Sequence, residues 1–272
     1  MQRLGDDWTD DQRALWDSFS VDFRDHFEQW TLQSARSLGR ALALDRAERV
    51  VEVGCGAGGA GVLLRPMLPD GASWTALDLS PRMVALAQQA LGPGATVVEG
   101  SAEALPFDDR AFDRLLSNMC LMLVADPVRA LEEAHRVTAP GGLAGWSVWG
   151  RPSESPMMTL VGQACDALGV DVPGIERPNF HLGEPGLLAD QVRGAGFTDV
   201  RAVNEPMVIG VADGAAFAQE MLYTGQRRRL WMATLGPEVE AALVAEVARR
   251  ADLVLASGRT LSLDVLQVVA TR

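Results

Sequence analysis

Lysine is absent from this sequence: all 24 basic residues are arginine, and 36 acidic residues bring the formal net charge to −12. We attribute the missing lysine to genomic composition, because no function requires it. An acidic surface repels phosphate backbones and anionic lipids, since nucleic-acid affinity comes largely from Lys and Arg neutralising phosphates. The short basic run at residues 227–229 falls in a helical pattern and is interpreted as a solvated face, with an anion site as the alternative. The charge balance therefore predicts no nucleic-acid partner.

Cysteine is scarce, and its spacing excludes two common uses. Cys55, Cys120 and Cys165 are odd in number, lie far apart and form no CxxC pair. They predict neither a disulfide framework nor a zinc site, and free thiols in a reducing compartment fit best. The histidines and carboxylates show no metal-ligand spacing either, so we expect no metal ion.

Long apolar runs are also missing. No stretch reaches the about eighteen uninterrupted apolar residues that a membrane-spanning helix needs. The opening stretch, MQRLGDDWTDDQ, is too acidic and polar for a secretory signal. The remaining composition, 48% hydrophobic and 22% charged, is typical of a globular α/β chain with a sizeable core. We therefore expect a cytoplasmic protein without membrane insertion.

The chain does contain a regular alternation of short β-branched runs with helical patterns. The expected strands are residues 50–53, 73–79, 95–99, 112–117, 143–149, 198–209 and 261–270. One intervening helix is capped by Ser80 with Pro81 in its first turn, and another is expected to end at the Pro-Gly-Gly of residues 140–142. Such alternation predicts a parallel sheet with helices on both faces. The expected fold class is α/β, with a Rossmann-like, mostly parallel sheet of seven strands.

The segments outside this alternation predict the domain organisation. Residues 1–45 carry aromatic side chains at three- and four-residue intervals, which predicts an N-terminal helical cap. Residues 46–150 would form the Rossmann-like core. The proline-rich residues 151–185 predict a lid or acceptor-pocket wall. Residues 186–272 would complete the core and contain a helical insertion at 213–256.

The most informative stretch is the glycine cluster at residues 54–59, directly after the first expected strand. Closely spaced glycines let the backbone turn sharply and approach a ligand without interference from a Cβ atom. The cluster also satisfies the GxGxxG pattern of dinucleotide-binding loops, so by itself it leaves the ligand open. Glu52 favours a cationic ligand, because a pyrophosphate-binding loop gains nothing from a carboxylate there.

Asp78 ends the second expected strand, about twenty residues after the loop, where a carboxylate can accept hydrogen bonds from both ribose hydroxyls. The alternative is that Asp78 serves the amino end of the helix that opens at Ser80. Together with Glu52 and the glycines, Asp78 indicates a nucleoside ligand that carries positive charge.

Five blocks in order resemble the class I S-adenosylmethionine-dependent methyltransferases: EVGCGAG, LDLSPRMV, GSAEALPF, FDRLLSN and HRVTAPGG. The chain looks most like the group that includes the ubiquinone and menaquinone C-methyltransferases, closely over residues 48–150 and more loosely over 183–200. The resemblance implies S-adenosylmethionine as cofactor and in-line transfer of its methyl group to a small acceptor. The Asn/Asp-Pro-Pro-Tyr block of macromolecular N-methylation is missing, since FDRLLSNMC stands in its place.

The resemblance also implies roles for individual residues. The glycine loop would lie against the methionine part of the cofactor, with Glu52 supporting the loop and the amino group, while Asp78 would hold the ribose. Leu79 and Met83 would make apolar contacts to adenosine, with plain helix core as the alternative for Met83. The block at 101–103 would read the adenine edge. The expected cofactor residues are Glu52, Gly54, Gly56, Gly58, Asp78, Leu79, Met83, Ser101, Ala102, Glu103 and Asn118.

The donor sulfonium is already activated, so most of the barrier reduction can come from holding acceptor and methyl group in a near-attack geometry. Asn118 lies where the family places residues near the sulfonium, and a strand-end turn residue is the alternative. A hydroxyl or acidic carbon acceptor also needs a general base. Of the three histidines, His26, His135 and His181, we select His181, because the insertion around it is where the family builds its acceptor pocket. A surface histidine is the alternative, and His135 is interpreted as structural.

Acceptor selection is expected from the N-terminal helices, the insertion 151–185 and the helical stretch 213–256. The aromatic and methionine side chains there favour an apolar or aromatic acceptor, or simply pack the cap. Two rival functions stay open: an NAD-dependent oxidoreductase on the same loop, and a cofactor-binding protein repurposed for a non-methylation reaction or a binding role. A monomer and a homodimer are both compatible with the sequence.

Overall fold

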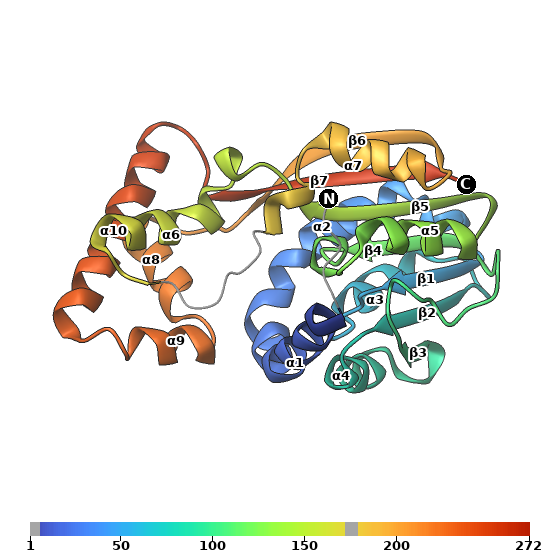
Figure 1. The fold of residues 1–272 in the computed structure, drawn as a ribbon, viewed down its shortest axis with the longest axis horizontal. Coiled ribbons are helices and arrows are strands. Elements are labelled where there is room, and N and C mark those ends of the chain that lie inside the picture. Colours follow the sequence, from blue (N-terminus) through green and yellow to red (C-terminus); the bar gives the residue numbers. More distant parts are fainter. Residues whose placement is uncertain (1–5, 172–178) are drawn as a thin grey trace. The chain divides into compact units, whose positions relative to one another are not determined.

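The computed structural model describes residues 6–171 and 179–272. Part of the expected lid, including Pro173 and Pro178, lies outside the described residues, as does the side chain of Arg227 in the basic run. The chain divides into two compact units (Figure 1). The first comprises Met1–Trp149, Asn179–Glu205 and Val265–Arg272, and the second comprises Gly150–Pro178 and Pro206–Asp264.

The first unit is built on a sheet of seven strands in the order β3-β2-β1-β4-β5-β7-β6 (Figure 1). Neighbouring strands from β3 to β5 pair in parallel, and β7 pairs antiparallel with β5. This confirms the predicted Rossmann-like, mostly parallel sheet. The strands are β1 Arg49–Val53, β2 Ser73–Asp78, β3 Thr96–Glu99, β4 Phe112–Asn118, β5 Thr138–Trp149, β6 Thr198–Val208 and β7 Ser262–Thr271.

Alternation along the strands gives the sheet two apolar faces. On one face, Val50 of β1 and Trp74 of β2 are buried with side chains of α2 (Glu28–Ala41), α3 (Gly59–Leu64) and α4 (Pro81–Leu91). Successive strand residues point to opposite faces, so Val51 and Val53 belong to the other core. Both faces of a parallel sheet are thus covered, as such sheets require.

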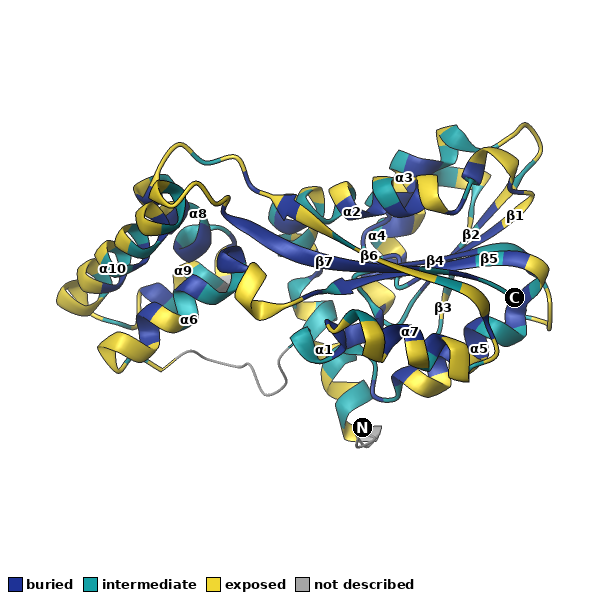
Figure 2. Ribbon diagram, turned by 90° about the horizontal axis from the view of Figure 1, so that it is seen from above, coloured by how far each residue is buried: buried dark blue, intermediate teal, exposed yellow. Residues whose placement is uncertain are grey.

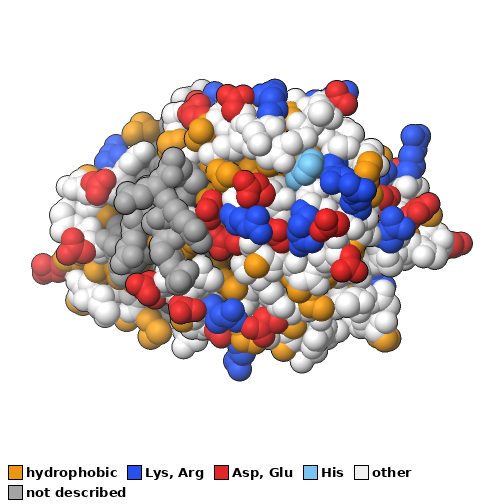
Figure 3. Space-filling view, turned by 45° about the vertical axis from the view of Figure 1, so that its right-hand side comes forward, with side chains coloured by type: hydrophobic (Ala, Val, Ile, Leu, Met, Phe, Trp, Pro, Cys, Tyr) orange, Lys and Arg blue, Asp and Glu red, His pale blue; other side chains and the backbone are white. Residues whose placement is uncertain are grey.

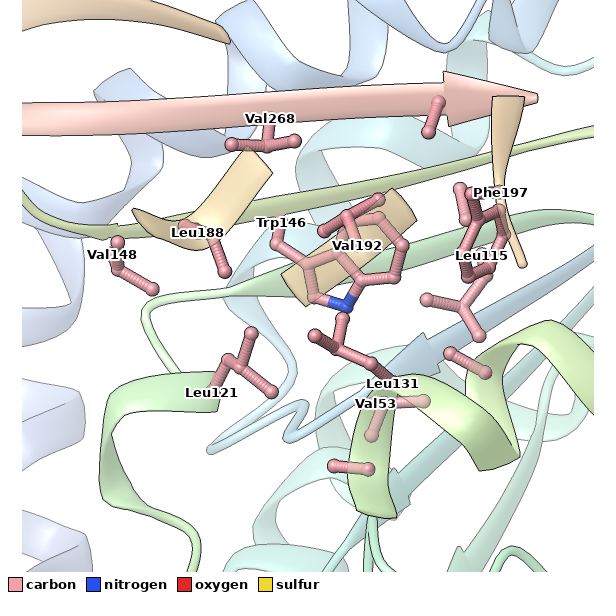
Figure 4. Close-up of a cluster of buried hydrophobic side chains, with 14 of the residues drawn as sticks. Val53, Leu115, Leu121, Leu131, Trp146, Val148, Leu188, Val192, Phe197 and Val268 are labelled. Carbon is pink, nitrogen blue, oxygen red and sulfur yellow. The ribbon is translucent and has the colours of Figure 1, made fainter. Parts of the chain in front are cut away.

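The second face packs against α5 (Pro127–Val137) and α7 (Pro185–Gly194). Figure 4 shows Trp146 of β5 at the centre of this cluster, with Leu131 and Val192 reaching toward it from the two helices. Figure 2 shows β7 as buried along most of its length, whereas β6, at the edge of the sheet, is mostly exposed.

The Pro-Gly-Gly segment at residues 140–142 corrects one prediction. The helix α5 already ends at Val137, where the Thr138 hydroxyl donates to the carbonyl of Ala134 at 2.7 Å, and Pro-Gly-Gly lies inside β5. The register with β4 shifts there, and Gly141 has a φ of 76°. A glycine at positive φ suits an irregularity in a strand as well as a helix end, so composition alone did not separate the two.

The N-terminal segment is helical, as predicted, but it is not one regular helix. α1 (Asp6–Asp22) continues through the π-helical turn η1 (Phe23–Phe27) into α2. The expected aromatic stripe packs on itself, with ring centroids 5.5 Å apart for Trp16 and Phe23 and 5.3 Å for Phe27 and Trp30. π-turns inside α-helices occur often at functional sites. The 3₁₀ turns are η2 Leu44–Arg46, η3 Arg65–Met67, η4 Gly92–Gly94, η5 Leu121–Leu123, η6 Pro152–Glu154 and η7 Asn179–Leu182.

The described residues of the second unit are mainly helical and include the end of β6 and the start of β7. Its longest helix, α10 (Pro237–Ala256), packs against α8 (Gly214–Tyr223) and α6 (Pro156–Leu168), and α9 (Gln226–Met232) packs against α8. Met221 and Met232, expected near an acceptor, are buried in this unit. No described helix is both long and apolar enough to pass through a membrane. On the face drawn in Figure 3, arginines and carboxylates are interspersed, as on a solvated surface.

Candidate functional site

The glycine cluster forms a tight turn between β1 and α3. The N–H groups of Gly54 and Cys55 both donate to the carbonyl of Leu77 in β2, at 2.8 and 3.0 Å, which ties the turn to the neighbouring strand. Gly54, Gly56 and Gly58 have φ values of 76°, 54° and 93°. Side-chain-bearing residues rarely adopt such values, so the turn needs glycine.

Side chains from three other elements enclose this turn. A Cβ at Gly54 would overlap the Cys120 side chain after β4, and one at Gly56 would lie 3.2 Å from the Phe23 ring of the π-turn. A Cβ at Gly58 would lie 3.0 Å from the backbone of α4. The three glycines therefore permit Cys120, Phe23 and α4 to pack closely against the turn.

Asp78 stands at the end of β2 and connects the turn to the next helix. One carboxylate oxygen accepts from the Gly56 N–H at 2.8 Å and the other from the Ser80 N–H at 3.0 Å. Burial raises the pKa of Asp78, and these two N–H groups partly offset that effect. The alternative role beside the helix opening at Ser80 is thus present in the structure. A carboxylate has about four acceptor positions, so Asp78 retains capacity for ribose hydroxyls.

Glu52 lies under the turn and is only 1% exposed. A Cβ on Gly61 would lie 3.2 Å from its Oε2 and 3.0 Å from the Trp74 indole nitrogen, so Glu52 faces α3 and Trp74. Burial raises the pKa of Glu52 to about 8, and Trp74 only partly offsets this. A pKa of about 8 makes the acid mainly protonated at neutral pH, whereas the sequence predicts a charged carboxylate there, and support of the loop by Glu52 remains a prediction. Contact with the cofactor's amino group remains a prediction.

The expected adenosine contacts differ in burial. Met83 is 1% exposed and is a buried residue of α4, which agrees with the alternative prediction that it belongs to the hydrophobic core. Its N–H donates to the Ser80 hydroxyl at 3.1 Å, which caps the helix. Leu79 is half-buried between Asp78 and this cap, so its side chain keeps accessible surface for a ligand.

The block after β3 forms a compact half-buried loop. The Ser101 hydroxyl accepts from the Glu103 N–H at 3.2 Å, and Ala102 lines a small apolar cavity behind β4. The Glu103 carboxylate accepts from the Asp126 N–H ahead of α5. Glu103 therefore joins this loop to the chain after β4, and its predicted contact with the adenine edge stays a prediction.

Asn118 ends β4 inside a buried polar network, which we call the Asn118 network. Its Oδ1 accepts from the hydroxyls of Ser34, at 2.8 Å, and Ser147, at 2.6 Å, and its Nδ2 donates to the Thr31 carbonyl at 3.2 Å. Gln267 of β7 donates to the Ser34 carbonyl at 3.2 Å. The Asn118 amide thus bonds the cap helix α2 to the sheet. A residue that only forms a turn at the end of a strand would make no such link.

His181 lies in η7, half-buried, and this turn packs against β5 and against η5, which follows β4. The adjacent Phe180 contacts Trp149, the last residue of β5, with ring centroids 5.1 Å apart. The turn that carries His181 therefore lies at the carboxyl ends of β4 and β5, close to the edge where a methyl acceptor is expected. His135 instead packs on Phe197, with centroids 5.1 Å apart, as a structural residue does.

Sequence reasoning missed two carboxylates of the N-terminal helices. Asp17 of α1 accepts from the Ser80 hydroxyl and from the Arg82 N–H. Glu28, the first residue of α2, accepts from the Gly59 N–H at 2.9 Å. Both residues sit next to members of the aromatic stripe, and that adjacency was the one signal available. The stripe predicted a buried helix face but not the loops that the face covers.

A glycine turn after β1, a carboxylate after β2 and a compact loop after β3 meet at the carboxyl edge of a parallel sheet. In doubly wound folds this edge binds nucleotides and related cofactors. Within residues 6–171 and 179–272, no group of three or more His, Cys, Asp or Glu side chains could hold a metal ion. The fold and the site thus define a Rossmann-like domain with a candidate nucleoside-cofactor site.

Comparison with known proteins shows which family this domain is similar to. A family model described as a methyltransferase domain matches residues 51–144. A demethylmenaquinone methyltransferase from Chlorobaculum tepidum is 32% identical over 115 residues, which are 42% of this chain and 46% of that protein. A probable phthiotriol/phenolphthiotriol dimycocerosates methyltransferase from Mycobacterium ulcerans is 44% identical over 97 residues, 35% of this chain and 37% of that one. The matches span less than half the length of these curated relatives.

Solved structures agree on the fold. A putative methyltransferase in complex with the Trm112 activator, from Haloferax volcanii, has a TM-score of 0.60 at 22% identity, covering 94% of this chain and 96% of that one. The [4+2]-cyclase SpnF has a TM-score of 0.55 at 20% identity, covering 88% and 80%. Residues 51–144 thus match a methyltransferase domain, this part of the chain is similar to demethylmenaquinone methyltransferases, and the fold is one that methyltransferases share.

Proposed function

We propose that the protein transfers the methyl group of S-adenosylmethionine to a small apolar or aromatic acceptor. The observation that carries this proposal is the joined arrangement of Gly56 and Asp78, a glycine turn bonded to a carboxylate at the carboxyl edge of the sheet. The methyltransferase-domain match over residues 51–144 supports the same function. The match argues against the nicotinamide-dependent oxidoreductase, the first rival.

In this mechanism the chain binds and orients. Asp78 would hold the ribose hydroxyls, the glycine turn would lie along the amino-acid part of the cofactor, and Leu79 would contact adenosine. When bound, the cofactor supplies an activated methyl group, so the protein needs no nucleophile of its own. The aromatic side chains of the N-terminal cap, with Phe23 against Gly56, would exclude water from this edge.

His181 is the proposed general base for an acceptor that must lose a proton. Its support is the packing of η7 against β5 and η5 at the carboxyl edge of the sheet. His181 is half-buried, and its Nε2 atom is enclosed, so Nδ1 is the nitrogen proposed to accept the proton. Replacement by glutamine is expected to lower kcat for a hydroxyl acceptor and to leave S-adenosylhomocysteine affinity unchanged, which links the residue to the acceptor.

The acceptor class rests on the residues outside the cofactor domain. Tyr223 and Trp231 of the second unit are half-buried and can contribute apolar surface, whereas Met221 and Met232 pack its interior. The curated relatives carry the names of methyltransferases for demethylmenaquinone, phthiotriol lipids and malonyl-[acyl-carrier protein]. These differing acceptors support a small molecule or lipid without selecting one among them.

A repurposed relative is the second candidate. A [4+2]-cyclase shares the fold at 20% identity, so the fold by itself leaves the reaction open. Calorimetry with S-adenosylhomocysteine and, separately, with NAD tests the cofactor, and binding of NAD alone would refute the proposal. Incubation with labelled S-adenosylmethionine and panels of quinols, phenols and acyl thioesters then tests turnover. Cofactor binding without any labelled product would favour the repurposed reading.

We also propose a cytoplasmic location and a monomeric or homodimeric state. The support for the location is three free cysteines, of which Cys55 and Cys165 are buried, since reduced thiols fit a reducing compartment. Light scattering on a purified sample measures the oligomeric state, and a tetramer or larger assembly would contradict this part of the proposal.

A further inference from the structure

Glu28 lies on the glycine turn. It is the first residue of α2, directly after the π-turn, and its Oε1 accepts from the Gly59 N–H at 2.9 Å. A Cβ on Gly59 would lie 2.7 Å from Oε2 and 2.9 Å from Oε1, so both oxygens face the backbone at the end of the turn. Among the described residues, Oε2 has no hydrogen-bond donor of its own.

Glu28 and Asp78 both act electrostatically on the buried Glu52. Burial raises the pKa of Glu28. Burial also raises the pKa of Glu52, and the negative charges of Glu28 and Asp78 raise it further. Arg24 is the one cation that lowers the pKa of Glu28, and its guanidinium is exposed and bonded to Asp25 at 2.7 Å. Among residues 6–171 and 179–272, no cation is found to offset the raised pKa values of Glu52 or Asp78.

Buried carboxylates without a cation favour the binding of a positively charged group. Glu52 faces α3 and is mainly protonated at neutral pH, so it provides little negative charge. Glu28 is more exposed than Glu52 and retains an oxygen without a donor. Glu28 is therefore the carboxylate best placed to meet a cation along the turn.

We infer that Glu28 binds the ammonium group of the cofactor's amino-acid part, an inference that rests on the proposed function. The cofactor carries two positive groups, a sulfonium and an ammonium, and only the ammonium has N–H donors. Oε2 of Glu28 would accept one of them while Oε1 keeps the Gly59 N–H. The cap would thus take part in cofactor binding through α2, in addition to covering the site.

A comparison of two ligands tests this inference. S-adenosylhomocysteine has the ammonium, whereas 5′-methylthioadenosine has the same nucleoside and thioether sulfur but no amino-acid part. Glu28→Gln is expected to weaken S-adenosylhomocysteine binding about tenfold or more, the size of one charge-assisted hydrogen bond. Binding of 5′-methylthioadenosine should be unchanged. The glutamine amide oxygen can still accept from Gly59, so the turn keeps its bond.

Asp25→Asn is the matched control, because Asp25 is an exposed carboxylate of the same segment that bonds Arg24. It should leave both affinities unchanged. Tighter binding of S-adenosylhomocysteine to Glu28→Gln would show that Glu28 occupies the place of the cofactor's own carboxylate and would overturn the inference. Unchanged binding, or equal loss for both ligands, would overturn it as well. If the unaltered protein binds neither ligand, the proposed function fails first, a result distinct from these.

Discussion

At the scale of single residues, position 54 needs glycine for two separable reasons. Its φ of 76° is unfavourable for other residues, and a Cβ there would overlap the side chain of Cys120. We expect Gly54→Ala to lose about 1–2 kcal/mol from the backbone and about 1–3 kcal/mol more from overpacking. Urea unfolding measures the loss of free energy of unfolding, and S-adenosylhomocysteine affinity should fall with it.

Gly71→Ala is the control for this loss. Gly71 has a φ of 84°, but no atom lies within 4 Å of its ideal Cβ, so only the backbone cost applies. We expect a loss of about 1–2 kcal/mol there and unchanged ligand affinity. Equal losses at the two positions would show that Cys120 moves aside and that the close packing of the turn is unimportant.

Glu52 makes stability depend on pH. Its pKa is raised from 4.5 to about 8 in the folded chain, so between those values the folded state holds a proton that the unfolded state has released. The free energy of unfolding should therefore fall as pH rises through this window, by up to about 1.4 kcal/mol per pH unit. Glu52→Gln removes this contribution and should be more stable than the unaltered protein at pH 8.

The measurement is urea unfolding of both proteins at pH 5, 6.5 and 8. Asp78 and Glu28 also have raised pKa values and remain in both proteins, so only the difference between the two curves reports Glu52. Parallel curves over this range would mean that Glu52 is ionised in the folded chain.

At the scale of elements, the Asn118 network bonds α2 to β4, β5 and β7. Asn118→Ala would leave the hydroxyls of Ser34 and Ser147 and the carbonyl of Thr31 without the amide they bond to. The Ser34 hydroxyl and the Thr31 carbonyl keep each other as partners, and the Ser147 hydroxyl keeps the Met119 N–H, so the cost is that of the lost amide bonds, about 1 kcal/mol each. We expect a loss of about 2 kcal/mol or more in the free energy of unfolding, and earlier proteolytic cleavage of α1 and α2.

Turnover separates this positioning role from a catalytic one. If Asn118→Ala keeps full stability and cap protection but loses kcat, the amide acts on the reacting groups, as first predicted. If the variant loses both stability and the protection of the cap against proteolysis, the result supports the positioning role. The sequence could place Asn118 at the end of a strand, but its partners lie 29 to 87 residues away along the chain.

The elements themselves were largely predictable. Short β-branched runs and glycine or proline punctuation located six of the seven strands to within a few residues, because strand and helix periods differ locally. The exception was β5, which begins at Thr138 because its Pro-Gly-Gly forms an irregularity in the strand. Whether a glycine lies in a strand or ends a helix depends on pairing with another strand. This pairing involves distant residues and cannot be predicted from the local sequence pattern.

At the scale of the whole molecule, the chain passes between the two units four times, after residues 149, 178, 205 and 264. The predicted cofactor-site residues all belong to the first unit, whereas residues 206–264, which contain α8, α9 and α10, belong to the second. We expect an exchange of 206–264 for the corresponding segment of a relative to change acceptor preference and to leave S-adenosylhomocysteine affinity unchanged. Competition between two acceptors measures the preference, and calorimetry measures the affinity.

An exchange of residues 151–171, the described part of the expected lid within the second unit, is the companion variant. This exchange should also change acceptor preference and leave S-adenosylhomocysteine affinity unchanged. Lost cofactor affinity with an unchanged acceptor preference in either variant would contradict this division of labour between the units.

The sequence alone determined the fold class, the glycine turn and the carboxylate at Asp78, because each follows from spacing within a few consecutive residues. Tertiary structure decided the rest. It placed Glu28 beside the turn and bonded the Asn118 amide to the cap helix α2. It also buried Glu52, which raises the pKa of this side chain. These outcomes depend on which distant segment covers a side chain and removes its water, and burial of that kind cannot be obtained from neighbours along the chain.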